Sequence, residues 1–427
     1  MNKELALKSL RGLWVGDCIG NMGQIYNVTD ILSALDEGIV KFGIDNIDSR
    51  GHSFQYSDDT DEAICLLNHL VNNSGSIDQD KLAMEFAERF MYHRDGGEQM
   101  GYGLMTRKVL TDIYNGVPWR EANLTFRKSE GMSKTDDVIA GLIAGKSVKE
   151  SLADLKKMTK DIPDANVMVG SCGNGSAMRV APLGAYYYDL SYGEVIKLAT
   201  LSAEPTHSHP EGIAGAIAIS ILTKDISLGV KDKLTLYNNV LMFTPDGEVK
   251  EGIIKASELP LDTPLSTLIE VLGNGTHVTC QDTVPLCVFL TIRALSQYPI
   301  EEMYEKVIID TCKCFGDVDT NCAIVGGMIG LISEPPQKWI RYCQPMEGVG
   351  DDPLPEIPSL SLRTTQIKVD KDAIKEALNS TNAWTTNTFD DIGASEYELQ
   401  CVMSEALKIP QSSFEEILAK RKAALKL

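Results

Sequence analysis

The chain has 427 residues, enough to bury a large hydrophobic core in one big domain with an appendage or in two domains. Its 40 lysines and arginines stand against 60 aspartates and glutamates, and the formal charge of −20 repels nucleic-acid phosphates and anionic membrane surfaces. No local basic patch overrides this charge. We therefore expect neither a nucleic-acid partner nor a membrane partner.

The ten cysteines are scattered through apolar helical patterns, which is typical of free core thiols in a reducing compartment. The first residues lack the apolar segment of a signal peptide. No run of about 18 apolar residues occurs anywhere in the chain. These features predict a soluble, cytoplasmic protein.

Helical periodicity dominates the chain. Apolar residues recur at helical spacing in residues 60–70, 82–90 and 213–221. Two segments, residues 212–216 and 323–327, are rich in glycine and alanine, which lets helix backbones approach closely. The sequence therefore predicts an all-α fold, a compact bundle of many helices.

Two segments depart from this periodicity. Residues 231–264 are less regular and contain a Pro245-Asp246-Gly247 turn, which predicts a small hairpin in a surface insertion. Residues 345–358 contain four prolines and an acidic pair, a composition typical of a linker, and three candidate helices follow. We predict a main domain over residues 1–345, and a linker with a helical C-terminal appendage over residues 346–427.

Two short acidic clusters, Ser57-Asp58-Asp59-Thr60 and Asp317-Val318-Asp319-Thr320, each begin an apolar, helix-like run. Aspartate and threonine at a helix start are ordinary caps, so one such cluster alone is more typical of capping than of metal binding. Two carboxylates at one helix start exceed what a cap needs, because like charges raise each other's pKa unless a cation lies between them. Two such helix starts in one chain favour a site for Mg²⁺, Mn²⁺ or Ca²⁺, which prefer oxygen ligands.

Two polar segments between the clusters are weaker signals. Residues 170–179 combine glycines with small polar residues before a helical run, as a loop does when its backbone approaches a phosphate or a sugar. They lack the ending of a P-loop and the elbow of a serine hydrolase. In Thr206-His207-Ser208-His209 the histidines could contact a substrate, cap and pack, or bind zinc. Zinc is disfavoured because no cysteine or third histidine lies at ligand spacing.

Six motifs follow one another in a set order: Gly16-Asp17-Cys18-Ile19-Gly20, Ser57-Asp58-Asp59-Thr60, Gly101-Tyr102-Gly103, Gly173-Asn174-Gly175-Ser176-Ala177-Met178-Arg179-Val180-Ala181-Pro182-Leu183, Thr206-His207-Ser208-His209-Pro210 and Gly316-Asp317-Val318-Asp319-Thr320. In this order they resemble the ADP-ribosylglycohydrolases, which include the dinitrogen-reductase-activating glycohydrolases. The resemblance implies an all-α fold with a binuclear metal centre in a cleft. It also implies hydrolysis of the bond that joins C1″ of ADP-ribose to an acceptor.

The resemblance implies roles for particular residues as well. Two Mg²⁺ or Mn²⁺ ions would be held by Ser57, Asp58, Asp59, Asp317, Asp319 and Thr320. As the catalytic base, Asp58 or Asp59 would orient the water nucleophile. ADP-ribose would be contacted by Gly101, Tyr102, Gly103, Ser171, Cys172, Gly173, Asn174, Gly175 and His207. The expected partners are an ADP-ribosylated protein or small-molecule acceptor, with arginine favoured, and ADP-ribose as the product.

Gln24 departs from the family pattern. Family members often carry a glutamate there that contacts the metal or its water, and an amide cannot serve as a base. One alternative is therefore a non-catalytic ADP-ribose-binding or structural relative. A third interpretation, a nucleoside or phosphate-ester hydrolase, is less favoured. Nucleoside hydrolases place their aspartate cluster after an N-terminal strand, whereas Asp58 opens a helical run.

Overall fold

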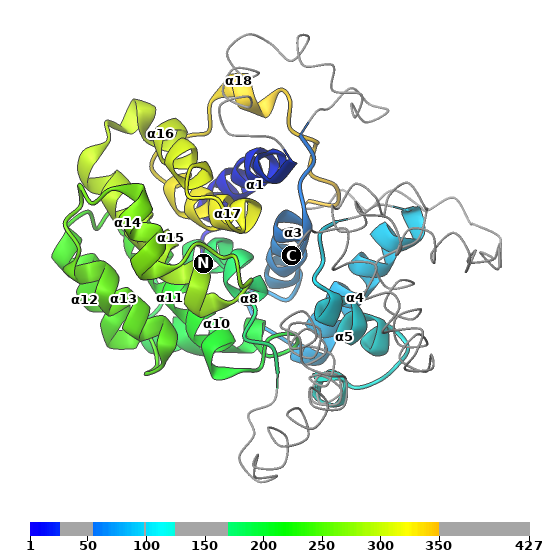
Figure 1. Ribbon diagram of the computed structural model, residues 1–427. Coiled ribbons are helices and arrows are strands. Elements are labelled where there is room, and N and C mark those ends of the chain that lie inside the picture. Colours follow the sequence, from blue (N-terminus) through cyan, green and yellow to red (C-terminus); the bar gives the residue numbers. More distant parts are fainter. Residues whose placement is uncertain (26–53, 98–99, 124–169, 350–427) are drawn as a thin grey trace, which may run out of the picture. The chain divides into compact units, whose positions relative to one another are not determined.

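The computed structural model describes residues 1–25, 54–97, 100–123 and 170–349 (Figure 1). All of them belong to one of the two compact units of the chain, the unit formed by residues 1–128 and 168–357. Within the described residues the secondary structure is helical, with two isolated β-bridges and no strand. The all-α prediction is thus confirmed.

The helices are α1 (Lys3–Ile25), α3 (Asp58–Asn72), α4 (Gln79–Gly96), α5 (Leu104–Tyr114), α8 (Gly175–Met178), α9 (Ala181–Tyr186), α10 (Tyr192–Ala203), α11 (Pro210–Ser227), α12 (Lys233–Phe243), α13 (Glu248–Glu258), α14 (Leu265–Leu272), α15 (Cys280–Gln297), α16 (Ile300–Cys312), α17 (Val318–Ile329) and α18 (Gln337–Ile340). All of them except α9 are labelled in Figure 1. None of these helices is long and apolar enough to cross a membrane. The cysteines among the described residues are free thiols, as the sequence predicts.

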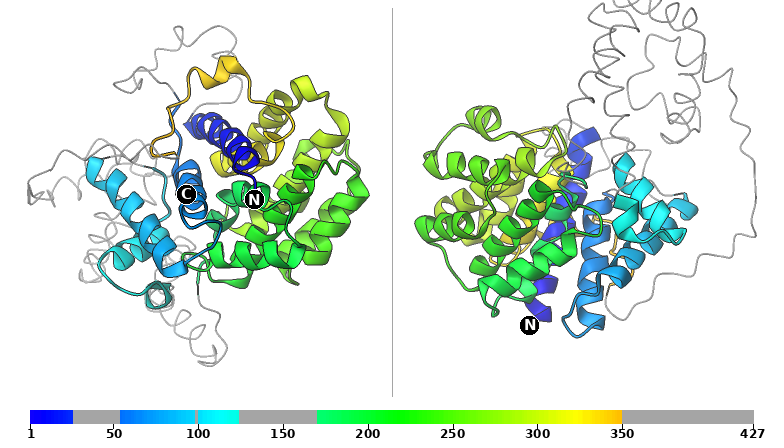
Figure 2. Two further views of the ribbon diagram at one scale, coloured as in Figure 1. Left: turned by 180° about the vertical axis from the view of Figure 1, so that it is seen from behind. Right: turned by 90° about the horizontal axis from the view of Figure 1, so that it is seen from below.

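Helices α1 and α17 lie side by side at backbone contact (Figures 1 and 2). A Cβ added at Gly12 would lie 2.2 Å from the carbonyl oxygen of Gly326, and one at Gly16 would lie 2.2 Å from that of Cys322. At Gly20 it would lie 2.6 Å from the Cα of Asp319. Glycine costs about 1 kcal/mol of helix propensity at each position, which this close packing offsets. The contact brings the start of α17 against the last turns of α1.

The segment predicted as a hairpin forms helices α12 and α13 instead, so that prediction is wrong. The Pro245-Asp246-Gly247 turn joins two helices, since Gly247 is the N-cap of α13. Apolar side chains at helical spacing on both helices are buried, including Leu236, Val240, Val249 and Ile253. The predicted C-terminal appendage lies outside the described residues, apart from its first few positions.

A candidate metal and ligand site between helices α3 and α17

The two acidic clusters meet where α3 and α17 begin. Ser57 is the N-cap of α3 and Asp317 the N-cap of α17. The Thr320 hydroxyl donates to Asp59 Oδ2 at 3.4 Å, and the Ser57 hydroxyl donates to the same oxygen at 2.9 Å. One carboxylate oxygen of Asp59 therefore accepts hydrogen bonds from its own cluster and from Thr320, which lies 261 positions further along the chain.

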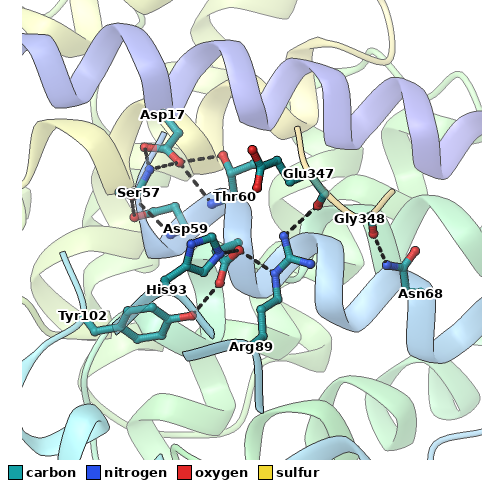
Figure 3. A network of polar contacts seen from close by, with 11 residues as sticks. Asp17, Ser57, Asp59, Thr60, Asn68, Arg89, His93, Tyr102, Glu347 and Gly348 are labelled. Atoms are coloured by element: carbon teal, nitrogen blue, oxygen red, sulfur yellow. Dashed lines mark hydrogen bonds and ion pairs between the residues drawn. The ribbon is translucent and has the colours of Figure 1, made fainter. Parts of the chain in front are cut away.

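Asp17 on α1 fixes the start of α3 (Figure 3), a role that its motif alone does not indicate. Its carboxylate accepts hydrogen bonds from the Ser57 backbone N–H at 2.9 Å, the Thr60 N–H at 3.0 Å and the Thr60 hydroxyl at 2.5 Å. Burial raises the pKa of Asp17 to about 6, although these hydrogen bonds oppose the shift. An acid between the glycines and apolar residues of residues 12–20 is the signal that could have identified it.

The carboxylates of both clusters resist ionisation. Burial raises the pKa of Asp58, Asp59, Asp317 and Asp319, most of them to well above the usual range. The charges of neighbouring carboxylates add to the shift, since both Asp58 and Asp59 lie in the field of Asp17, Asp317 and Asp319. The site therefore lacks the positive charge that would allow these carboxylates to ionise together.

The side chains of the two clusters carry the oxygen ligands that suit a hard cation. Asp59 Oδ1 is buried and has no hydrogen-bond partner among the residues that the structure describes. Carboxylate and hydroxyl oxygens are the ligands that Mg²⁺ and Mn²⁺ prefer. Among the described residues, however, no three acidic, histidine or cysteine side chains already form a metal-binding group.

The glycine loop is packed around the ring of His207. A Cβ added at Gly175 would lie 2.6 Å from His207 Cε1, and one at Gly173 would lie 3.3 Å from His207 Nε2. The N–H of Gly173 donates to the Ser171 hydroxyl at 3.0 Å, and that of Asn174 to the Val278 carbonyl at 3.2 Å. These glycines make room for an imidazole, and two N–H groups of the loop are already occupied.

His207 is a neutral, buried imidazole. Its Nδ1 lies 2.8 Å from the Thr206 hydroxyl. Burial, together with the charge of Arg179, lowers the pKa of His207 to about 3. The second histidine of the motif has another role, because His209 caps α11 by accepting a hydrogen bond from the Glu211 N–H at 3.1 Å.

Asn174 joins the glycine loop to the second acidic cluster. Its amide nitrogen donates to Asp317 Oδ2 at 2.6 Å and to the Thr283 hydroxyl at 3.0 Å. The backbone carbonyl of Cys172 accepts from the Cys280 N–H at 2.9 Å, which fastens the other end of the loop to α15. The predicted ligand loop is thus held directly against a predicted metal ligand.

The Gly101–Gly103 segment lies beside the first cluster. A Cβ added at Gly101 would lie 2.9 Å from Asp58 Oδ1. Tyr102 is buried, and Gly103 is the N-cap of α5. Gln24 lies in the last turn of α1, and the placement of its side chain falls outside the described residues.

The chain is similar to known proteins over most of its length. A family model described as ADP-ribosylglycohydrolase matches residues 2–366. ADP-ribosylhydrolase ARH3 from Mus musculus is 22% identical over 366 residues, which cover 79% of this chain and 87% of the mouse protein. ADP-ribosylhydrolase ARH3 from Gallus gallus is 24% identical over 368 residues, with 78% and 88% coverage.

Among solved structures, a chain of an ADP-ribosylglycohydrolase-related protein complex matches with a TM-score of 0.46 and 18% identity. The match covers 80% of this chain and 93% of that one. The family model alone spans well over half of the chain. The protein therefore belongs to the ADP-ribosylglycohydrolase family.

Proposed function

We propose that this protein hydrolyses the C1″ glycosidic bond of ADP-ribose and so removes ADP-ribose from a modified acceptor. The observation that carries the proposal is the meeting of the two acidic clusters, in which Asp59 receives hydrogen bonds from both Ser57 and Thr320. The family of the chain and the names of its ARH3 relatives support the same reaction.

The metal ligands that we propose are the hydroxyls and carboxylates of Ser57, Asp58, Asp59, Asp317, Asp319 and Thr320. When bound, two Mg²⁺ or Mn²⁺ ions would acidify water and stabilise charge as the glycosidic bond breaks. The raised pKa values of the carboxylates favour this assignment, because ionised carboxylates this crowded need a cation between them.

The chain's own groups would then carry out the proton transfer. Asp58 or Asp59 orients a water molecule and accepts one of its protons while the water oxygen bonds to C1″. The acceptor leaves with the electrons of the broken bond and takes up a proton from solvent, and the carboxylate returns its own proton to solvent.

Substrate contacts are proposed for the two loops next to the carboxylates. Residues 171–175 with His207 would contact ADP-ribose on the side of Asp317, and residues 101–103 on the side of Asp58. A neutral His207 can donate one hydrogen bond and accept another without adding charge. The acceptor would be a protein or a small molecule, and arginine is the one that we would test first.

The experiment measures free ADP-ribose released from arginine-linked and serine-linked ADP-ribosyl peptides, with Mg²⁺ and with a chelator. Metal-dependent release from either peptide, lost in Asp317→Asn but kept in the exposed control Asp246→Asn, is the expected result. Binding of ADP-ribose without release from either peptide would overturn the proposal. It would favour the non-catalytic alternative suggested by Gln24.

A further inference from the structure

Asp61, one turn into α3, is the centre of a buried polar network, in which Figure 3 labels Arg89, His93 and Tyr102. Its Oδ1 accepts from Arg89 Nε at 2.5 Å and lies 2.9 Å from His93 Nε2, and its Oδ2 accepts from the Tyr102 hydroxyl at 2.8 Å. Arg89 and His93 are on α4, and Tyr102 is on the loop before α5. Both carboxylate oxygens are therefore occupied by side chains.

Asp61 and Arg89 form a buried ion pair, since the side chains of Arg89 and Asp61 are 5% and 0% exposed. A buried anion with three donors holds those donors firmly, because charge-assisted hydrogen bonds are about twice as strong as neutral ones. The network is thus suited to fixing the position of what is attached to it.

Tyr102 attaches the loop over Asp58 to this centre. The Asp58 N–H donates to the carbonyl of Met100 at 2.5 Å, and the Tyr102 hydroxyl donates to Asp61. Residues 100–102 are therefore bound to α3 on both sides of Gly101. Gly101 in turn lies so close that an added Cβ would be 2.9 Å from Asp58 Oδ1. The loop backbone limits where the Asp58 side chain can move.

Arg89 extends the network in the other direction. Its Nη2 donates to the Glu347 carbonyl at 2.9 Å, and Asn68 Nδ2 donates to the Gly348 carbonyl at 2.5 Å. Replacing Arg89 would therefore disturb residues 347–348 as well as the loop. Tyr102 gives a cleaner test, because its ring also packs edge-on against Phe90 and would stay in place without the hydroxyl.

We infer that Asp61 and Tyr102 are positioning residues, a latch that holds residues 100–102 against α3 and thereby sets the orientation of the Asp58 carboxylate. The expected effect of the latch on catalysis rests on the proposed function. The latch itself is a property of the protein without substrate or metal, so it can be measured separately.

The test compares Tyr102→Phe with Tyr237→Phe, a matched control that loses a buried tyrosine hydroxyl bonded to the Ala256 carbonyl on α13. Hydrogen exchange reports the latch, because the Asp58 N–H is held by Met100. We expect exchange in residues 57–62 and 100–104 to rise about fivefold in Tyr102→Phe alone. We also expect weaker Mn²⁺ binding, measured by electron paramagnetic resonance, and a kcat for ADP-ribose release about tenfold lower with KM little changed.

Unchanged hydrogen exchange in residues 57–62 and in residues 100–104 would overturn the latch. Faster exchange with unaltered Mn²⁺ binding would overturn its role in positioning Asp58. If the wild-type protein releases no ADP-ribose, the proposed function fails, whereas exchange and Mn²⁺ binding still decide the inference. A second variant, Asp61→Asn, should show the same changes with a lower melting temperature, since it leaves Arg89 buried beside a neutral group.

Discussion

Arg179 and Glu62 form a buried ion pair, with 2.6 Å between Nη1 and Oε2 and side-chain exposures of 0% and 1%. Nη2 of Arg179 also donates to the Ser202 carbonyl and to the Thr206 hydroxyl, each at 2.8 Å. The Thr206 oxygen in turn lies next to His207. The arginine of the long glycine motif is therefore an internal tie between α3 and the His207 loop.

Breaking this pair should be costly. Arg179→Met leaves Glu62 buried without its partner, and we expect the free energy of unfolding to fall by about 3–5 kcal/mol. In Glu62→Leu/Arg179→Met the loss should be smaller than the sum of the two single losses, because no unpaired charge remains. Urea unfolding measures both. The control is Lys250→Met, which breaks an exposed pair and should cost less than about 1 kcal/mol. Additive losses would contradict this account.

The glycine loop can be tested by adding one methyl group. In Gly175→Ala the new Cβ would lie 2.6 Å from His207 Cε1, so the imidazole must shift, and we expect a loss of about 1–3 kcal/mol. Gly193→Ala is the matched control, because an added Cβ there meets nothing within 4 Å at the start of α10. It should leave stability unchanged or raise it by up to about 1 kcal/mol. Equal behaviour of the two variants in thermal unfolding would show that His207 does not require the glycine.

Much of this fold could be predicted because it depends on local periodicity. The apolar repeats of residues 60–70 and 213–221 are helices α3 and α11, and the alanine–glycine run of residues 323–327 is the surface of α17 that packs on α1. The hairpin prediction failed because a Pro-Asp-Gly turn joins helices as readily as strands. The four-residue spacing of Leu236 and Val240 was the better guide.

The site could be predicted only in part, because its contacts join distant segments. The order of the motifs indicated that Asp59 and Thr320 belong together, and the structure places them in contact. The hydrogen bonds from the start of α3 to Asp17 span 40 positions or more, and no local pattern shows them. The centre at Asp61 depends likewise on how α4 and the Tyr102 loop pack on α3.

The neutral state of His207 predicts an acid-sensitive stability. The pKa of about 3 in the folded protein lies below the ordinary value of about 6.5, so the unfolded chain binds the extra proton between these values. This contribution is complete above pH 6.5 and is lost as the pH falls toward 3. His207→Asn cannot take up that proton. The stability of the wild type relative to this variant should fall by on the order of 1 kcal/mol per pH unit below pH 6.5. Urea unfolding at pH 7.5, 6 and 5 measures the difference, and a constant difference would show that folding does not lower the pKa of His207.

Two apolar residues beside the candidate site hold strained backbone conformations. Val278 has φ 54° and Phe315 has φ 55°, and both side chains are more than half exposed. The left-handed region costs a residue with a Cβ about 1–2 kcal/mol, and glycine avoids this cost at the expense of about 0.5–1 kcal/mol of chain entropy. Both residues are in loops that hold site residues, since the Val278 carbonyl accepts from the Asn174 N–H and Phe315 lies two positions before Asp317.

Relieving this strain should stabilise the protein. We expect Val278→Gly to raise the free energy of unfolding by about 0.5–1 kcal/mol, whereas Val271→Gly should lower it by about 1 kcal/mol. Val271 is the matched control because it is a similarly exposed valine within helix α14. Thermal unfolding of the two variants measures the contrast. If Val278→Gly proves as destabilising as the control, then the exposed valine makes contacts worth more than its strain, and the loop's conformation is maintained by its side chain rather than in spite of it.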